Sequence, residues 1–164
     1  MQANDDMRRV RHIRAGAGTT WWAAGDTCTF KAISEDTNRR FTIFELSVPA
    51  RTGPPLHVHQ VEDEAYYILE GELEMRDHKR VRKLRAGDFV HIPPGTPHTF
   101  KNPGSQRCRI LVFISPAGLE NFFFEVGQPA RAGEQAPVPG AEELERMLAA
   151  APKYGLTLHL PDAE

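Results

Sequence analysis

The stretches GPPLHVHQVEDEAYYILEG, residues 53–71, and GDFVHIPPGTPHTFKN, residues 87–102, decide how this chain is interpreted. The first contains His57, His59 and Glu64, and the second contains His98. Imidazole and carboxylate groups are the side chains with which proteins bind divalent transition metals. We therefore expect the two stretches to meet in space and to form one metal site.

Strand geometry places the first two histidines on one face. Side chains in a β-strand alternate between two faces, so His57 and His59 project from the same side. Glu64 follows His59 by five residues, an odd number that would put its side chain on the opposite face of an unbroken strand. We predict a bend within residues 60–63, after which Glu64 and Tyr66 share one face.

The sequence on either side of these stretches is typical of short strands. Segments rich in β-branched and aromatic residues alternate with turn signals made of Gly, Pro, Asn and Asp. The expected strands lie within residues 27–32, 41–48, 65–75, 88–92 and 109–114. Many short strands with such turns predict an all-β sandwich or barrel.

The C-terminal part of the chain has a different pattern. Residues 119–126 favour a short helix, residues 128–140 form an irregular linker rich in Pro and Gly, and residues 142–151 have apolar positions at helical spacing. We divide the chain into an N-terminal arm (1–20), a β-barrel domain (21–118) and a C-terminal helical extension (119–164). The extension is expected to pack on the barrel or on a partner subunit.

Composition narrows the class of protein. The 164 residues are 40% hydrophobic and 26% charged, with a formal net charge of −2, which gives no electrostatic reason to expect nucleic acid or membrane as a partner. The basic run from Arg76 to Arg85 is interpreted as a solvated hairpin face. Cys28 and Cys108 are expected to be buried free thiols, and without an apolar leader or span we expect a cytoplasmic protein.

The two stretches resemble both signature motifs of the cupin superfamily, over about residues 40–115. The positions that match are His57, His59, Glu64 and Gly71 in the first motif, and Gly87, Pro93, Gly95, His98 and Asn102 in the second. The first motif departs at its leading glycine, where this chain has Arg51, with Gly53 as the nearest glycine. The resemblance implies the cupin double-stranded β-helix, a jelly-roll barrel, with the C-terminal helical extension added to it.

The resemblance also implies a ligand set for one divalent transition metal ion. That set is His57, His59, Glu64 and His98, and the sequence does not choose among Fe, Mn, Co, Ni, Cu and Zn. Of the neighbouring acidic residues, the motif spacing excludes Glu62 as the carboxylate ligand, permits Asp63 and favours Glu64.

The histidines outside the motif positions are expected to have other roles. His91 is interpreted as an ordinary strand histidine, with a supporting role beside the site as the alternative. His12, His78 and His159 have no motif context and are expected to be exposed.

A narrower resemblance is to the single-domain cupins related to quercetin 2,3-dioxygenase. It implies a metal-dependent dioxygenase that acts on a flavonol-like or other enolisable phenolic small molecule, with Glu64 as the catalytic residue that takes the substrate's hydroxyl proton. Phe44, Tyr66 and Phe100 are candidates to line its apolar pocket, although each is equally well explained as barrel core. The alternatives are a metal-dependent isomerase or polyketide-type cyclase, and a non-enzymatic small-molecule-binding cupin. The family also implies a homodimer.

Overall fold

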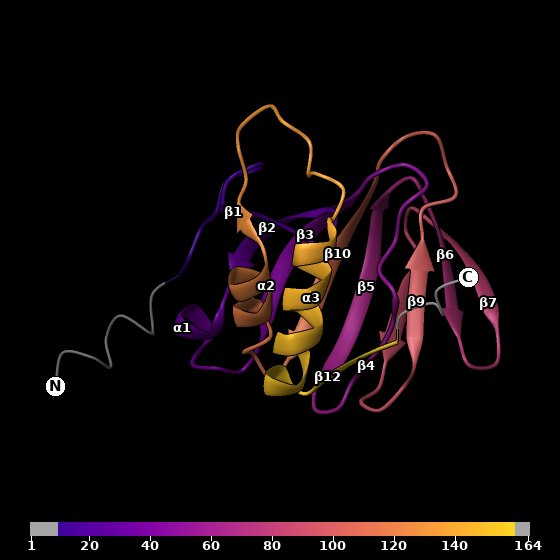
Figure 1. Ribbon diagram of the computed structural model, residues 1–164. Coiled ribbons are helices and arrows are strands. Elements are labelled where there is room, and N and C mark those ends of the chain that lie inside the picture. Colours follow the sequence, from indigo (N-terminus) through magenta and orange to yellow (C-terminus); the bar gives the residue numbers. More distant parts are fainter. Residues whose placement is uncertain (1–9, 160–164) are drawn as a thin grey trace, which may run out of the picture.

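The computed structural model describes residues 10–159, which form two antiparallel sheets packed around one core (Figure 1). One sheet has 7 strands in the order β11-β1-β2-β3-β10-β5-β8, and the other has 5 in the order β12-β4-β9-β6-β7. This arrangement confirms the predicted all-β jelly-roll fold. The first part of the expected N-terminal arm, residues 1–9, lies outside the described residues.

The predicted strands 27–32, 41–48, 88–92 and 109–114 and the two predicted helices are present, with ends that shift by a residue or two. The predicted strand 65–75 is divided at Gly71 into two strands, one in each sheet. The first sheet contains β1 (Thr19–Ala23), β2 (Asp26–Ala32), β3 (Thr42–Val48), β5 (Asp63–Glu70), β8 (Phe89–Ile92), β10 (Cys108–Ser115) and β11 (Gln128–Pro129). The second contains β4 (Leu56–His59), β6 (Glu72–Asp77), β7 (Val81–Arg85), β9 (His98–Lys101) and β12 (Leu156–His159). The helices are α1 (Ser34–Thr37), α2 (Glu120–Val126) and α3 (Ala141–Ala150).

The alternation of buried and partly exposed residues explains how the strands form the core. In β3 every second side chain is buried, and β10, its neighbour, has nearly the same period. Apolar side chains from both sheets meet between them, including Phe44, Ile110, Met75 and Phe100. Because the strand period is two, the same faces that carry the core side chains also carry those of the site.

A tight turn sets the start of β2. Ala24 and Gly25 both have positive φ, 56° and 83°, as in the two-residue turns that best join antiparallel strands. The turn is tied to α3, because the backbone N–H of Ala24 donates to Oε1 of Glu143 at 2.9 Å. Asp26 follows directly and points into the protein, with 4% of its surface exposed.

Buried Glu120 joins the barrel to its C-terminal part. Its carboxylate accepts hydrogen bonds from the backbone N–H and hydroxyl of Ser34, from Thr42 Oγ1 at 2.7 Å and from the N–H of Gly118 at 2.9 Å. These bonds outweigh the effect of burial, which alone would raise the pKa of Glu120, so its pKa lies below the ordinary value. The beginning of α2 is therefore fixed to β3 and α1.

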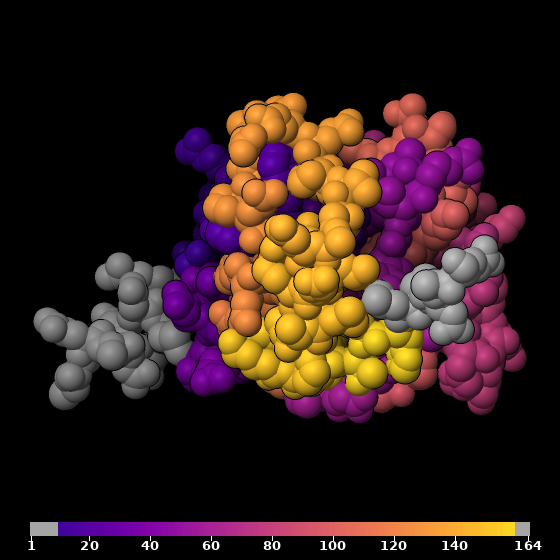
Figure 2. Space-filling view, in the orientation of Figure 1, coloured from indigo at the N-terminus to yellow at the C-terminus, as the bar shows by residue number. Residues whose placement is uncertain are grey.

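The C-terminal residues add strands as well as helices to the fold. Figure 2 shows the segment 127–140 and α3 running over one face of the molecule. Residues 128–140, expected to be an irregular linker, begin with β11, which pairs with β1. After α3 the chain makes a 3₁₀ turn, Ala151–Tyr154, and continues into β12, which pairs with β4. The sequence pattern did not predict either strand.

Other parts of the fold agree with the sequence-based expectations. Cys28 and Cys108 are buried free thiols, and the basic run lies on the β6–β7 hairpin. His12, His78 and His159 are exposed. Among the described residues, no helix is both long and apolar enough to pass through a lipid bilayer.

Candidate metal centre

The short strand β4 positions the first two histidines. His57 and His59 are both buried and point to the same side of the strand. Pro54 and Pro55 precede the strand and fix the backbone at its entry. β4 lies between β12 and β9 in the second sheet, so segments from near the C-terminus and from the second motif hold it on its two edges.

The predicted bend returns Glu64 to the histidines. β4 ends at His59 and β5 begins at Asp63, with an irregular backbone between them. Gln60 N–H donates to the carbonyl of Gly155 at 2.8 Å, which holds the start of the bend against the C-terminal part of the chain. Glu64 is then 5% exposed and faces the cluster, while Asp63 points outward.

The second motif brings His98 next to the first. His98 lies directly opposite His57 in the pairing of β4 with β9 and has no exposed surface. The loop before β9 is fastened to β4, because the N–H of Gly95 donates to the carbonyl of His59 at 2.7 Å. Asn102 closes the motif by donating from its side chain to the carbonyls of Val48, Pro49 and Gln106.

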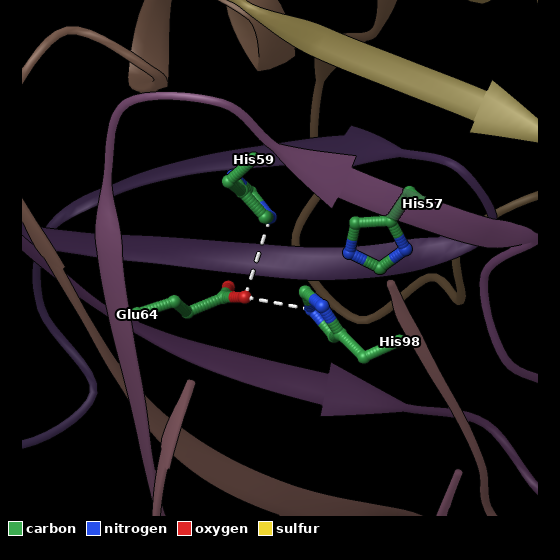
Figure 3. Close-up of side chains that lie close together, drawn as sticks. All are labelled: His57, His59, Glu64 and His98. Atoms are coloured by element: carbon green, nitrogen blue, oxygen red, sulfur yellow. Dashed lines mark hydrogen bonds and ion pairs between the residues drawn. The ribbon is translucent and has the colours of Figure 1, made fainter. Parts of the chain in front are cut away.

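The four side chains meet at one point inside the barrel (Figure 3). One potential ligand atom from each of His57, His59, Glu64 and His98 lies within 4.8 Å of every other. Oε2 of Glu64 is central, 3.0 Å from Nε2 of His98 and 3.3 Å from Nε2 of His59. The structure thus brings together all four residues that the motif spacing singled out.

Backbone carbonyls determine which ring nitrogens can bind a cation. A carbonyl oxygen only accepts, so Nδ1 of His57 donates to Pro55 O and Nδ1 of His98 donates to Thr96 O, each at 2.9 Å. In the neutral rings this leaves the lone pairs on Nε2, which face the cluster. Nδ1 of buried His59 has no hydrogen-bond partner among the described residues, and its Nε2 has only the ion-pair contact with Glu64.

The electrostatics of the cluster give His57 and Glu64 the protonation states of metal ligands, whereas without a bound cation His59 favours its protonated form. Burial, with the neighbouring His98 and His59, lowers the pKa of His57 to about 3, so this ring is neutral near pH 7. Burial alone would raise the pKa of Glu64, but His59 and His98 outweigh it and hold that pKa well below the ordinary value. Burial would also lower the pKa of His59, yet Glu64 and Glu62 outweigh it and raise that pKa.

These features fit a bound cation. Metal ligands are neutral imidazoles and ionised carboxylates, and a cation would take up lone pairs that otherwise face one another in a buried space. An unpartnered buried nitrogen, such as Nδ1 of His59, is uncommon in folded proteins. Three histidines and one carboxylate leave coordination positions open on a five- or six-coordinate ion.

The cluster borders an apolar cavity of about 80 Å³. The three predicted pocket residues, Phe44, Tyr66 and Phe100, all line it, and so do His57, His59 and Glu64. Asp26 also lines it, although no sequence pattern predicts that a residue before the first expected strand would reach the site. The lining residues Met147, Leu156 and Leu158 come from the C-terminal part of the chain.

A larger surface groove adjoins this cavity. Its volume is about 780 Å³, and it shares Ala24, Pro54, Pro55, Phe100 and Met147 with the inner cavity. Ligands of ordinary size occupy sites of about 300–1,000 Å³. A molecule larger than the inner cavity would therefore extend from the cluster into the groove.

The structure also locates the acidic residues and the histidine that the sequence left open. Asp63 is exposed and pairs with His91, 2.7 Å from carboxylate oxygen to ring nitrogen, on the outer side of the sheet. His91 is thus a strand histidine away from the cluster, as interpreted. Glu62 is buried beside Nδ1 of His59, 3.8 Å from it. At that distance Glu62 makes no hydrogen bond to the ring, but its charge helps to raise the pKa of His59, an effect that its spacing alone did not suggest.

The barrel and its internal cluster define a class of protein, a jelly-roll barrel with a candidate metal site between its sheets. The Cupin domain family matches residues 44–114. An oxalate-binding protein of Thermotoga maritima is 30% identical over 108 residues, which are 65% of this chain and 84% of the relative. The chain belongs to the cupin family.

Two further comparisons extend over more of the chain or its fold. Quercetin 2,3-dioxygenase of Bacillus subtilis is 27% identical over 152 residues, which are 93% of this chain but 45% of the relative. This chain thus spans about half the length of that relative. A solved structure of a predicted oxalate decarboxylase from Thermotoga maritima covers 64% of this chain and 98% of its own, with a TM-score of 0.60 and 22% identity. At that identity the likeness concerns the fold alone.

Proposed function

We propose that the chain is a metal-dependent dioxygenase that acts on a flavonol-like or other enolisable phenolic small molecule, with dioxygen as its second substrate. The observation that carries the proposal is the buried cluster of three imidazoles and one carboxylate beside an apolar cavity. Similarity to a quercetin 2,3-dioxygenase along most of this chain supports the choice of reaction. A bound metal would supply a Lewis acid that polarises a substrate oxygen.

The side chains of the cluster have distinct roles in this proposal. His57, His59 and His98 hold the ion through Nε2, with the rings of His57 and His98 oriented by the backbone carbonyls that their Nδ1 groups contact. Glu64 completes the set and takes the proton of the substrate hydroxyl. Its low pKa keeps it ionised, and it lies where a hydroxyl entering the cluster comes within hydrogen-bond reach.

The cavity supports the proposed substrate class. Phe44, Tyr66 and Phe100 give it aromatic walls that suit a planar ring and exclude water. Since its volume is only about 80 Å³, the reacting ring would enter it while the rest of a flavonol lies in the adjoining groove.

The proposal is tested by measuring oxygen uptake. The purified chain is first stripped of metal and then loaded with Fe, Mn, Co or Ni. With quercetin as substrate, we expect uptake with at least one metal, and a loss of at least about 100-fold in the rate with Glu64→Gln, as general-base catalysis contributes about 10²–10⁴-fold. Absence of uptake with every metal, for quercetin and for simpler enolisable phenols, would exclude a dioxygenase of this class.

A non-enzymatic binding protein is the second candidate. The small inner cavity and the 30% identity to an oxalate-binding protein favour it. Denaturation would then release a small molecule carried through purification, and mass spectrometry would detect it. No turnover would be seen with or without dioxygen. Turnover without dioxygen would instead point to an isomerase or cyclase.

We also propose that the chain forms a homodimer, as its family resemblance implies. Tyr67, Leu69, Phe89 and Phe113 are exposed on the outer face of the first sheet, on neighbouring strands β5, β8 and β10. Clustered apolar side chains on a sheet surface are a common mark of a protein contact. A second copy of the chain that packs there would remove them from water.

A further inference from the structure

Two buried carboxyl groups stand apart from the histidine cluster, and they differ sharply. Glu120 is 1% exposed and accepts hydrogen bonds from Ser34, Thr42 and Gly118, as buried carboxylates with a structural role do. Asp26 is 4% exposed, and its Oδ1 has no hydrogen-bond partner among the described residues. Glu120 therefore has a structural role, whereas one carboxyl oxygen of Asp26 is left without a hydrogen bond.

Asp26 faces the cavity rather than the packed core alone. It is the first residue of β2 and lines the cavity together with Tyr66 and Glu64. The cavity wall thus holds two carboxyl groups, one from the candidate metal cluster and one from outside it.

The energetics argue against a structural reason for an acid at this position. A buried polar atom without a partner is destabilising relative to one that forms its hydrogen bond. Burial raises the pKa of Asp26 well above its ordinary value, so the side chain tends to keep its proton. A protonated carboxyl group in an apolar wall can donate one hydrogen bond and accept another.

We propose that Asp26 is a substrate-binding residue, whose carboxyl group hydrogen-bonds an oxygen of the molecule that occupies the cavity. The ligand would have one oxygen substituent at the histidine cluster and a second one at Asp26, with an apolar body between them. Such a pattern selects polyhydroxylated or keto-substituted phenols over phenols with a single oxygen. This inference rests on the proposed function, since it assumes that the cavity beside the cluster is the substrate site.

Two variants of Asp26 separate a ligand-binding role from a structural one. Asp26→Leu has the same branched shape but no polar atom, and Asp26→Asn keeps a donor and an acceptor. If Asp26 serves the ligand, Asp26→Leu raises the melting temperature by about 2–4 °C, since it removes an unsatisfied buried group. Glu120→Gln is the matched control, a change in a satisfied buried carboxyl group away from the cavity, and it should lower the melting temperature.

Calorimetric binding of quercetin and of hydroquinone, whose two oxygens lie at opposite ends of one ring, to the metal-loaded protein gives the second readout. We expect Asp26→Leu to weaken binding about tenfold, whereas Asp26→Asn and Glu120→Gln stay within a few-fold of the unsubstituted protein. The role of Asp26 would be overturned if Asp26→Leu binds as tightly as the unsubstituted protein, or if its melting temperature falls. Either result would leave the proposed function standing. If the unsubstituted protein binds neither probe, the proposed phenolic substrate and the role of Asp26 both fall.

Discussion

Individual residues of the two motifs have separable physical roles. The histidines and Glu64 form the candidate metal cluster, whereas Asn102 makes no contact with it and instead binds three backbone carbonyls at a turn. Gly71 has a φ of 82°, and an added Cβ would lie 3.1 Å from the carbonyl oxygen of Arg107. The motif spacing therefore reflects backbone geometry as much as ligand chemistry.

Arg51, which stands where the first motif has its leading glycine, adopts a backbone conformation that favours glycine. Its φ is 66°, in the left-handed region. We predict that Arg51→Gly raises the free energy of unfolding by about 1 kcal/mol, because it relieves backbone strain that exceeds the entropy glycine loses on folding. Urea denaturation checks this, with Arg51→Ala as the control that keeps the Cβ. Equal stability of the two variants would show that the backbone at this turn is not strained.

At the level of helices and strands, Glu120 fastens α2 to the barrel in a way that depends on pH. Its pKa is lower in the folded chain than the ordinary value of 4.5. The stabilisation is therefore complete above that ordinary value and is lost as pH falls through the lowered pKa. We predict that Glu120→Gln lowers the free energy of unfolding by about 1–2 kcal/mol at pH 7, and that the difference shrinks in acid. Denaturation series at pH 7 and pH 3 measure it; a difference that is constant with pH would contradict the account.

The strand β12 supports the strand that carries two of the candidate ligands. Leu156 is 5% exposed and lies opposite His59 in the pairing of β12 with β4. We predict that Leu156→Ala costs about 2–4 kcal/mol of stability and weakens metal affinity, because β4 loses packing along one edge. Leu148→Ala, at a position 39% exposed on α3, is the control and should change stability by less than about 0.5 kcal/mol. Unchanged metal affinity in Leu156→Ala would show that β12 does not position β4.

The elements differ in how far the sequence could predict them. Strands β3, β8 and β10 and helices α2 and α3 carry their period and turn signals within a few residues, and the structure has them where these signals indicate. The pairing of β12 with β4 joins segments almost a hundred residues apart, and β11 is only two residues long. No local period encodes such contacts, which depend on the packing of the whole chain.

The candidate site shows the same limit. The motif spacing and the bend before Glu64 predicted which four side chains would meet, because each spacing is a local property of a strand or turn. Asp26 and Glu62 had no such signal, since their importance arises only from what surrounds them after folding. An acidic residue in a sequence is expected at the surface, and only the structure shows these two to be buried.

At the scale of the whole molecule, the exposed apolar face of the first sheet tests the proposed homodimer. Phe89 is 65% exposed and pairs across strands with Tyr67. We predict that the unsubstituted chain has the mass of a dimer in light scattering after size-exclusion chromatography, and that Phe89→Glu shifts it toward the monomer because a charge would then be buried in the contact. A monomeric mass for the unsubstituted chain would contradict the dimer.

The central claim is that the fold brings two distant motifs together as one metal site. Metal content by elemental analysis, with affinity by calorimetry, tests it most directly in three proteins: the unsubstituted chain, His98→Ala, and His91→Ala as the control on the same motif. We predict one divalent ion per chain for the first and third. Removal of a residue that only hydrogen-bonds to a metal ligand lowers metal affinity roughly 10–100-fold. For His98→Ala we predict a larger loss of metal affinity. Equal metal content and affinity in His98→Ala and the unsubstituted chain would contradict the account.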